Sequence, residues 1–287
     1  MRILIYILFA INLLSCSSEK SKNRQLIKAL SVNDVKLDAP KPSDWLYEHN
    51  EKGQTFDEYL FSSPIRPNDS RYVIYLQPIG QFDSLQSVQL KSTHEYLKAF
   101  FGLEVAVLDP LANDLVPDSA RRIGAHGDEQ FLASYILYEL LKQRLPKDAI
   151  GMMAITATDL YPKPSWNYVF GLSSLKNRVS VTSMYRFEDD DSAKSLNRLL
   201  KVSTHEIVHM LSMKHCINAL CLMNGSNHLA ETDRKPNHLC SECTGKLMWN
   251  LNKSPMERLN ELSNFFKKHG FEVENERLLK DIEVLKK

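Results

Sequence analysis

The stretch Thr204–Cys243 reads THEIVHMLSMKHCINALCLMNGSNHLAETDRKPNHLCSEC, and its histidines and cysteines decide the fold. His205 and His209 are four residues apart, which on a helix places their imidazoles about 40° apart on one face and roughly 6 Å apart along the axis. Two imidazoles so placed can bind one zinc ion with bonds of about 2.0–2.1 Å. Glu206 points beside such a metal, where its carboxylate can take a proton from water activated by the zinc.

His215 is the candidate for a third ligand. It lies six residues after His209, too far around the axis if the helix continues. If the chain turns near Ser212 and Met213, His215 can swing back and complete a three-histidine site with one open position. Three protein ligands and one open position are typical of a catalytic zinc site.

Four of the five cysteines follow within a short span, and we expect them to bind a second metal ion: Cys216, Cys221, Cys240 and Cys243. Four thiolates at about 2.3 Å in a tetrahedron make a closed, structural zinc site. The alternative is disulfides, with three possible pairings, in an exported protein. A C-x-x-C pair opposed to a second close pair favours zinc. Because Cys216 directly follows His215, this cluster would also fix the third histidine.

The segments upstream predict alternating strands and helices. Strand-like composition marks Tyr72–Leu76, Leu103–Leu108, Ala149–Thr156, Asn167–Leu172 and Val179–Ser183. Helical spacing of apolar residues marks Ser84–Phe101, Asp128–Arg144 and a long helix, Ser192–Leu211, that carries the first two histidines. Two more helices, Ser254–Lys268 and Glu274–Lys287, are expected at the C-terminal end. This order predicts an α/β sandwich with a mixed sheet.

The run H-E-x-x-H-x-x-S-x-x-H-C-x4-C-x-M, followed by the C-x-x-C pair, resembles the archaemetzincins, a family of metzincin-type zincins. The stretch TDLYPKPSWNYVFG (Thr158–Gly171) is similar as well, and the resemblance covers roughly residues 72–245. It implies an α/β (α+β), metzincin-like sandwich and a zinc metallopeptidase, endopeptidase or aminopeptidase-like, acting on peptides or proteins. It implies two zinc ions, one catalytic and one structural, with Glu206 as general base and Met223 in the turn beneath the catalytic zinc.

Two departures from the family pattern leave other functions open. Ser212 stands where the family usually has Gly, and a positive φ at Ser costs on the order of 1 kcal/mol. Sixteen residues separate Met223 from Cys240, about one fewer than usual. A catalytically impaired binding protein with the zinc fold is therefore one alternative. A zinc hydrolase of non-peptide amides is another.

Other residues near the motif receive weaker interpretations. Asn167–Phe170 (NYVF) is expected either as ordinary sheet or as an edge strand beside the zinc helix that takes an extended peptide by strand addition. His228 and His238 are expected to be loop residues and not ligands. His94 is given no role.

The N-terminus has the composition of an export signal. The apolar run Ile3–Leu14 is twelve residues long, whereas crossing a bilayer takes about 20. Ser15 precedes Cys16, as in bacterial lipoprotein signals, where cleavage leaves an acylated cysteine. An ordinary secretory signal or a membrane anchor is the alternative. We therefore expect a lipid-anchored protein of the bacterial cell envelope, facing the periplasm or the surface.

The domain prediction follows these signals. Residues 1–15 are the signal peptide, 16–70 a tether and N-terminal extension, 71–250 the catalytic domain and 251–287 a C-terminal helical extension. The composition, 43% hydrophobic and 25% charged with a formal net charge of +1, is that of a globular protein. Because the sequence has no cluster of basic residues interleaved with aromatic ones, we expect no nucleic-acid partner.

Overall fold

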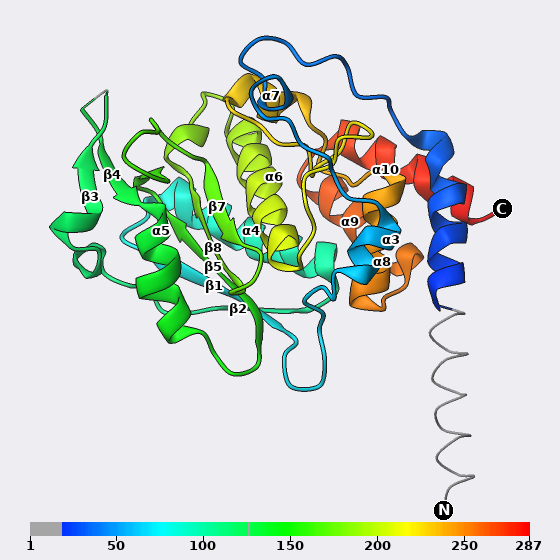
Figure 1. The fold of residues 1–287 in the computed structure, drawn as a ribbon, viewed down its shortest axis with the longest axis horizontal. Helices are drawn as coiled ribbons and strands as arrows, with labels where there is room; N and C mark the ends of the chain where they lie inside the picture. Colours follow the sequence, from blue (N-terminus) through cyan, green and yellow to red (C-terminus); the bar gives the residue numbers. More distant parts are fainter. Residues whose placement is uncertain (1–18, 126) are drawn as a thin grey trace, which may run out of the picture.

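The computed structural model describes residues 19–125 and 127–287. Its centre is a five-stranded sheet in the order β2-β1-β5-β8-β7 (Figure 1). The strands are β1 (Val73–Ile79), β2 (Glu104–Val107), β5 (Ala149–Thr156), β7 (Gly171–Ser174) and β8 (Val179–Ser183). All neighbours are parallel except β7, which pairs antiparallel with β8 at one edge. The prediction of a mixed sheet is confirmed.

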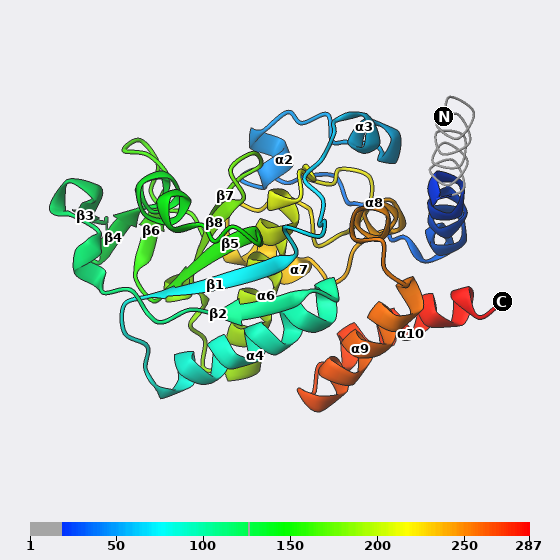
Figure 2. The same ribbon diagram turned by 90° about the horizontal axis from the view of Figure 1, so that it is seen from below.

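Helices cover both faces of this sheet. One face carries α4 (Ser84–Phe101) and α6 (Ser192–Met210), and in Figure 2 α4 lies below β1 and β2. The other face carries α5 (Ala133–Tyr135) and the helical turns that continue it to Arg144. The side chains of β5 alternate between two apolar clusters, one on each face, so that all eight of its residues are buried. The predicted sandwich is confirmed.

The predicted helix Asp128–Arg144 is wrong in its first turn. Glu129–Leu132 instead forms β4, which pairs with β3 (Arg121–Ile123) and β6 (Asp159–Tyr161) in a second, three-stranded sheet. The buried amide of Gln130 donates to Asp159 Oδ2 at 2.6 Å, which anchors β4 beside β6. These long-range pairings override the helical spacing of the apolar residues.

The expected strand Asn167–Leu172 is displaced toward the C-terminus. Only Gly171–Ser174 pairs as a strand, so the NYVF segment is not the edge strand. The guanidinium of Arg122 donates to the backbone oxygens of Trp166 and Asn167, at 2.6 and 2.8 Å. The bond to Asn167 occupies the first carbonyl that the predicted strand would use for pairing.

The N-terminal extension is more ordered than a tether. Residues 19–30 form a helix that buries Leu26 and Leu30 against the main core. The chain then crosses the molecule past α7 (Leu229–Arg234) and forms α2 (Trp45–Glu48) and α3 (Phe56–Phe61), as the blue segment in Figure 1 shows. The expected signal peptide and Cys16 lie outside the described residues. In the described part of the chain, no helix has the length and hydropathy needed to span a bilayer.

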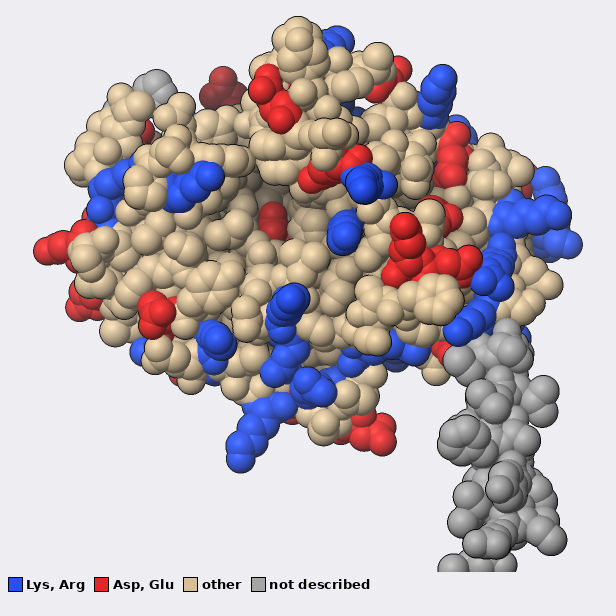
Figure 3. All heavy atoms as spheres, viewed as in Figure 1, with Lys and Arg blue, Asp and Glu red and all other residues tan. Residues whose placement is uncertain are grey.

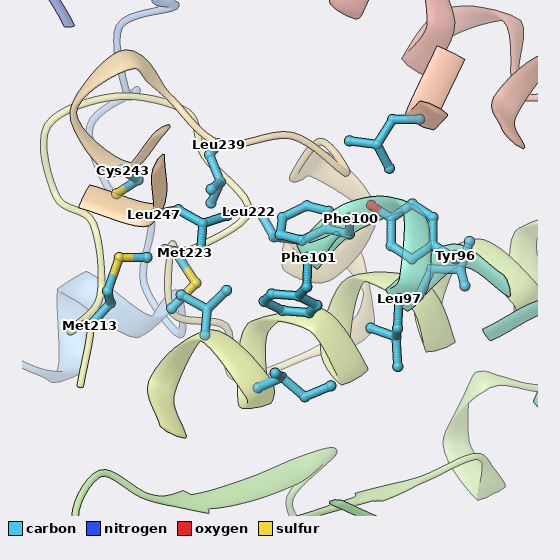
Figure 4. Close-up of a cluster of buried hydrophobic side chains, with 14 of the residues drawn as sticks. Tyr96, Leu97, Phe100, Phe101, Met213, Leu222, Met223, Leu239, Cys243 and Leu247 are labelled. Atoms are coloured by element: carbon cyan, nitrogen blue, oxygen red, sulfur yellow. The ribbon is translucent and has the colours of Figure 1, made fainter. Parts of the chain in front are cut away.

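The C-terminal helices close the structure beside α4. They are α8 (Ser241–Leu251), α9 (Pro255–Lys268), with Pro255 in its first turn as expected, and α10 (Glu272–Leu285). Figure 4 shows Phe100 and Phe101 at the end of α4 packed toward Leu222 and Met223, in the loop that carries the first two cysteines. The loop after α6 is therefore held by apolar packing as well as by its polar groups.

Candidate active site

The structure brings the three predicted histidines together. The ring centroids of His205 and His209 are 4.5 Å apart, and His215 lies 5.2 and 4.9 Å from them. One nitrogen from each ring lies within 4.8 Å of the other two. The chain reverses at Ser212, which has a φ of 69°, as the expected break in the helix required.

The hydrogen bonds of the His205 and His209 rings show which of their nitrogens are available to bind a metal ion. The Nδ1 of His205 lies 3.0 Å from the Leu222 carbonyl, and that of His209 lies 2.6 Å from the Met213 carbonyl. A carbonyl only accepts, so both Nδ1 atoms carry the proton and both Nε2 atoms present bare lone pairs. These Nε2 atoms face each other at 3.0 Å. Ligands of one tetrahedral zinc have nitrogens about 3.3 Å apart, so a cation resolves the repulsion.

The protonation of these rings also suits a metal. Burial lowers the pKa of His205 well below its usual value and that of His209 to about 3. Both imidazoles are therefore neutral, which is the form that binds zinc.

Glu206 lies beside the histidines and is largely buried. Burial raises its pKa to about 7, against the lowering effects of the Ser173 hydroxyl and the Lys235 ammonium. Ser173 Oγ lies 2.9 Å from the Glu206 backbone oxygen and also bonds its Oε2. A Cβ on Gly171 would lie 2.8 Å from Glu206 Cγ, so β7 passes directly against this side chain. The carboxyl group is confined by the edge strand.

Lys235 adds a buried positive charge to the same cavity. Its ammonium donates to the Asn224 carbonyl at 2.8 Å and to Ser226 Oγ at 3.0 Å. Burial lowers its pKa to about 8, and the negative charge of Glu206 opposes that shift. Neither Ser173 nor Lys235 was predicted from the sequence, because no local pattern marks them.

The third histidine has a different kind of partner. Its Nδ1 lies 2.9 and 3.0 Å from the two carboxylate oxygens of Glu51, in the N-terminal extension. The Trp45 ring meets the His215 ring edge-on, with centroids 5.1 Å apart. Burial raises the pKa of Glu51, but the hydrogen bond with His215 lowers it, and the pKa lies below its usual value overall. Sequence reasoning missed both residues.

A cavity of about 750 Å³ opens over the histidines. Its walls come from β7, the segment before β7, and the N-terminal extension. Three exposed lysines stand along it: Lys52, Lys163 and Lys214. Figure 3 shows the hollow on this face, with Lys and Arg side chains (blue) around it and atoms of an Asp or Glu residue (red) inside. The space is large enough for an extended peptide segment.

The four predicted cysteines form a second, fully buried cluster. Their Sγ atoms all lie within 4.8 Å of one another, and those of Cys216 and Cys240 are 3.6 Å apart. Sulfurs on one tetrahedral zinc are about 3.8 Å apart, whereas a disulfide joins them at about 2.05 Å. Cys221 Sγ also accepts from the amides of Met223 and Cys240, at 3.4 and 3.3 Å. The donors and spacing fit zinc and not a disulfide.

The other residues singled out in the sequence have structural contacts. Met223 is buried, in a turn closed by a 3.0 Å bond from the Asn224 amide to the Cys221 carbonyl. His228 caps α7 by accepting from the Glu231 amide at 3.2 Å. Burial lowers the pKa of His238 to about 4. Neither histidine belongs to the three-histidine group.

Comparisons with known proteins agree with this geometry. A family model described as peptidase family M54 matches residues 131–249, which include both clusters. Archaemetzincin-2 of Homo sapiens is 35% identical over 263 residues, covering 77% of this chain and 71% of the relative. Archaemetzincin of Archaeoglobus fulgidus is 32% identical, covering 61% and 99%.

Solved structures show the same likeness. The archaemetzincin of Methanopyrus kandleri aligns with a TM-score of 0.54 at 29% identity, over 65% of this chain and 99% of that one. The Archaeoglobus fulgidus protein, solved in complex with malonate, aligns with a TM-score of 0.50 at 30% identity, over 61% and 99%.

Proposed function

Because the chain belongs to the archaemetzincin family of zinc metallopeptidases, we propose that it hydrolyses peptide bonds with Glu206 as general base. A catalytic zinc ion would be held by His205, His209 and His215. The observation that carries this proposal is the pair of bare Nε2 atoms facing each other at 3.0 Å beside a buried carboxyl group. Peptide cleavage by the native protein, assayed over a peptide library and a set of small amides, tests it. Cleavage of the small amides alone would overturn it.

The zinc ion and the side chains around it have different roles in the proposed reaction. A zinc ion bound there would supply a Lewis acid that polarises the scissile carbonyl and acidifies the attacking water. Glu206 takes the proton from the attacking water and returns it to the leaving amine. Ser173 orients the carboxyl group through its contacts with Glu206. In the described structure β7 pairs only with β8, so its outer edge is free to accept an extended substrate by strand addition.

The position of His215 bears on the alternative of an impaired binding protein. That alternative predicts a third histidine that faces away from the other two. Here the His215 ring faces both of them, and Ser212 Oγ accepts from the Ile65 amide at 3.2 Å. The serine therefore gains a bond that glycine could not make, which offsets part of the strain at its positive φ.

Gly171→Ala is expected to lower kcat by about 10²-fold with the zinc content unchanged, because small misplacements of a catalytic group are that costly. The added Cβ would lie 2.8 Å from Glu206 Cγ and push the carboxyl group out of place. Steady-state kinetics with metal analysis measures both effects.

Gly151→Ala is the matched control for crowding. Its Cβ would meet the flexible end of Met210 at the same 2.8 Å, within the core. We expect its kcat to stay within a few-fold of the native value. Native kcat in Gly171→Ala would contradict the role given to Glu206.

We also propose that the four cysteines hold a second, structural zinc ion. The thiols should then resist alkylation in the native protein and react, all four, after chelation in denaturant without any reductant. Mass spectrometry of the alkylated protein counts them. Disulfides would instead leave the thiols unreactive until a reductant is added.

A further inference from the structure

The segment before α3, residues 34–55, lies against both candidate metal sites, and we call it the strap. At the cysteine cluster, the Leu220 amide donates to the Val35 carbonyl at 2.8 Å, and Lys36 forms an antiparallel bridge with Ala219. Asp34 accepts from the Ser241 amide at 2.8 Å, next to Cys240. The strap is thus attached to the loop that carries Cys216 and Cys221 and to the start of α8, where Cys240 and Cys243 lie.

The strap then passes over the turn that brings back His215. Gln54 Oε1 accepts from the Lys214 amide at 3.2 Å, and the buried Lys246 ammonium donates to the Gln54 carbonyl. Gln54 is itself buried. Gln54, three positions after Glu51, is thus bonded to Lys214, the residue immediately before His215. This bond fixes the strap beside the third histidine.

Glu51 supplies what the other two histidines obtain from the backbone. The Nδ1 atoms of His205 and His209, on α6, donate to backbone carbonyls of the loop that follows this helix, whereas His215 meets a carboxylate 164 residues away in the chain. A carboxylate partner on Nδ1 fixes the proton there, leaves Nε2 free and makes the imidazole a stronger donor to a metal. Glu51 and Trp45 together set the orientation of this ring.

We propose that Glu51 is a positioning residue of the zinc site, so that the strap is a working part of the metal centre. This inference rests on the proposed function, because it requires zinc at the three histidines. It predicts that the histidine-bound zinc depends on a residue outside the segment that carries the zinc-binding motif, while the cysteine-bound zinc does not depend on it.

The test is the zinc affinity of the full chain, measured by competition with a chelator. Glu51→Ala should weaken zinc binding at one of two sites by about 10–100-fold. Glu51→Gln should weaken it less, because the amide oxygen still accepts from Nδ1–H. Glu48→Gln, the same change on an exposed strap residue, should bind zinc as the native chain does.

Thermal unfolding of the chelator-treated chains separates a local effect from a loss of fold. Equal unfolding temperatures for metal-free native and Glu51→Ala protein, with weaker zinc binding by the variant, support the proposal. If the alanine variant does not fold, the Gln variant decides by its zinc affinity alone. Native zinc affinity in the folded Glu51 variants would overturn the positioning role. A native chain with no zinc at the histidines would instead overturn the proposed function.

Discussion

Glu206→Gln is expected to lower kcat by about 10²–10⁴-fold, the usual contribution of a general base. The amide has the shape of the carboxyl group but cannot take up a proton. It keeps a contact with Ser173, so the loop and the three histidines should stay in place. Initial rates on a cleaved peptide, together with zinc analysis, give the two quantities.

The control for this variant is Glu48→Gln, which removes a negative charge from an exposed site on α2. It should leave kcat within about twofold, since surface changes have small effects. Retention of native kcat by Glu206→Gln would show that the proton is handled by another group.

His205→Ala is expected to abolish hydrolysis and reduce zinc from two ions per chain to one. It removes one of the two Nε2 atoms that face each other at 3.0 Å, and two remaining imidazoles do not make a three-ligand site. The cysteine cluster shares no ligand with the histidines, so its zinc should remain. Metal analysis of protein purified without chelator measures the difference.

His94→Ala is the matched histidine control. His94 lies on α4, where its Nε2 contacts the Val105 carbonyl at 2.9 Å, away from both clusters. It should keep two zinc ions and native rates. Two zinc ions in His205→Ala would mean that the second ion is not bound by the three histidines.

The parts of the site that could be predicted are those set by spacing along the chain. The four-residue interval between His205 and His209 needs only a helix, and α6 supplies one from Ser192 to Met210. The return of His215 needs only a left-handed residue between them, and Ser212 takes that conformation. The histidine site and the long helix could therefore be predicted from local geometry alone.

The missed parts depend on contacts between distant segments. Glu51 reaches His215 across 164 positions, and Ser173 reaches Glu206 across 33. No periodicity along the chain marks a carboxylate or a hydroxyl that ends beside a particular ring. The polar composition of the strap predicted a tether for the same reason, because its bonds are made to Ala219 and its neighbours.

Contacts between distant segments also explain why a helix was predicted where β4 forms. The apolar residues of 128–144 have helical spacing throughout, and α5 begins at Ala133 as a helix should. The preceding four residues are taken into a sheet by β3 and β6, which lie on either side of them. Pairing partners of this kind cannot be read from one segment alone.

Diffraction at the zinc absorption edge, on crystals of the native chain purified without chelator, tests the proposed zinc site most directly. The proposal predicts two anomalous peaks, one among the four cysteine sulfurs and one within about 2.0–2.1 Å of a nitrogen from each of His205, His209 and His215. No peak at the histidines, or a peak there with His215 outside bonding distance, would contradict it.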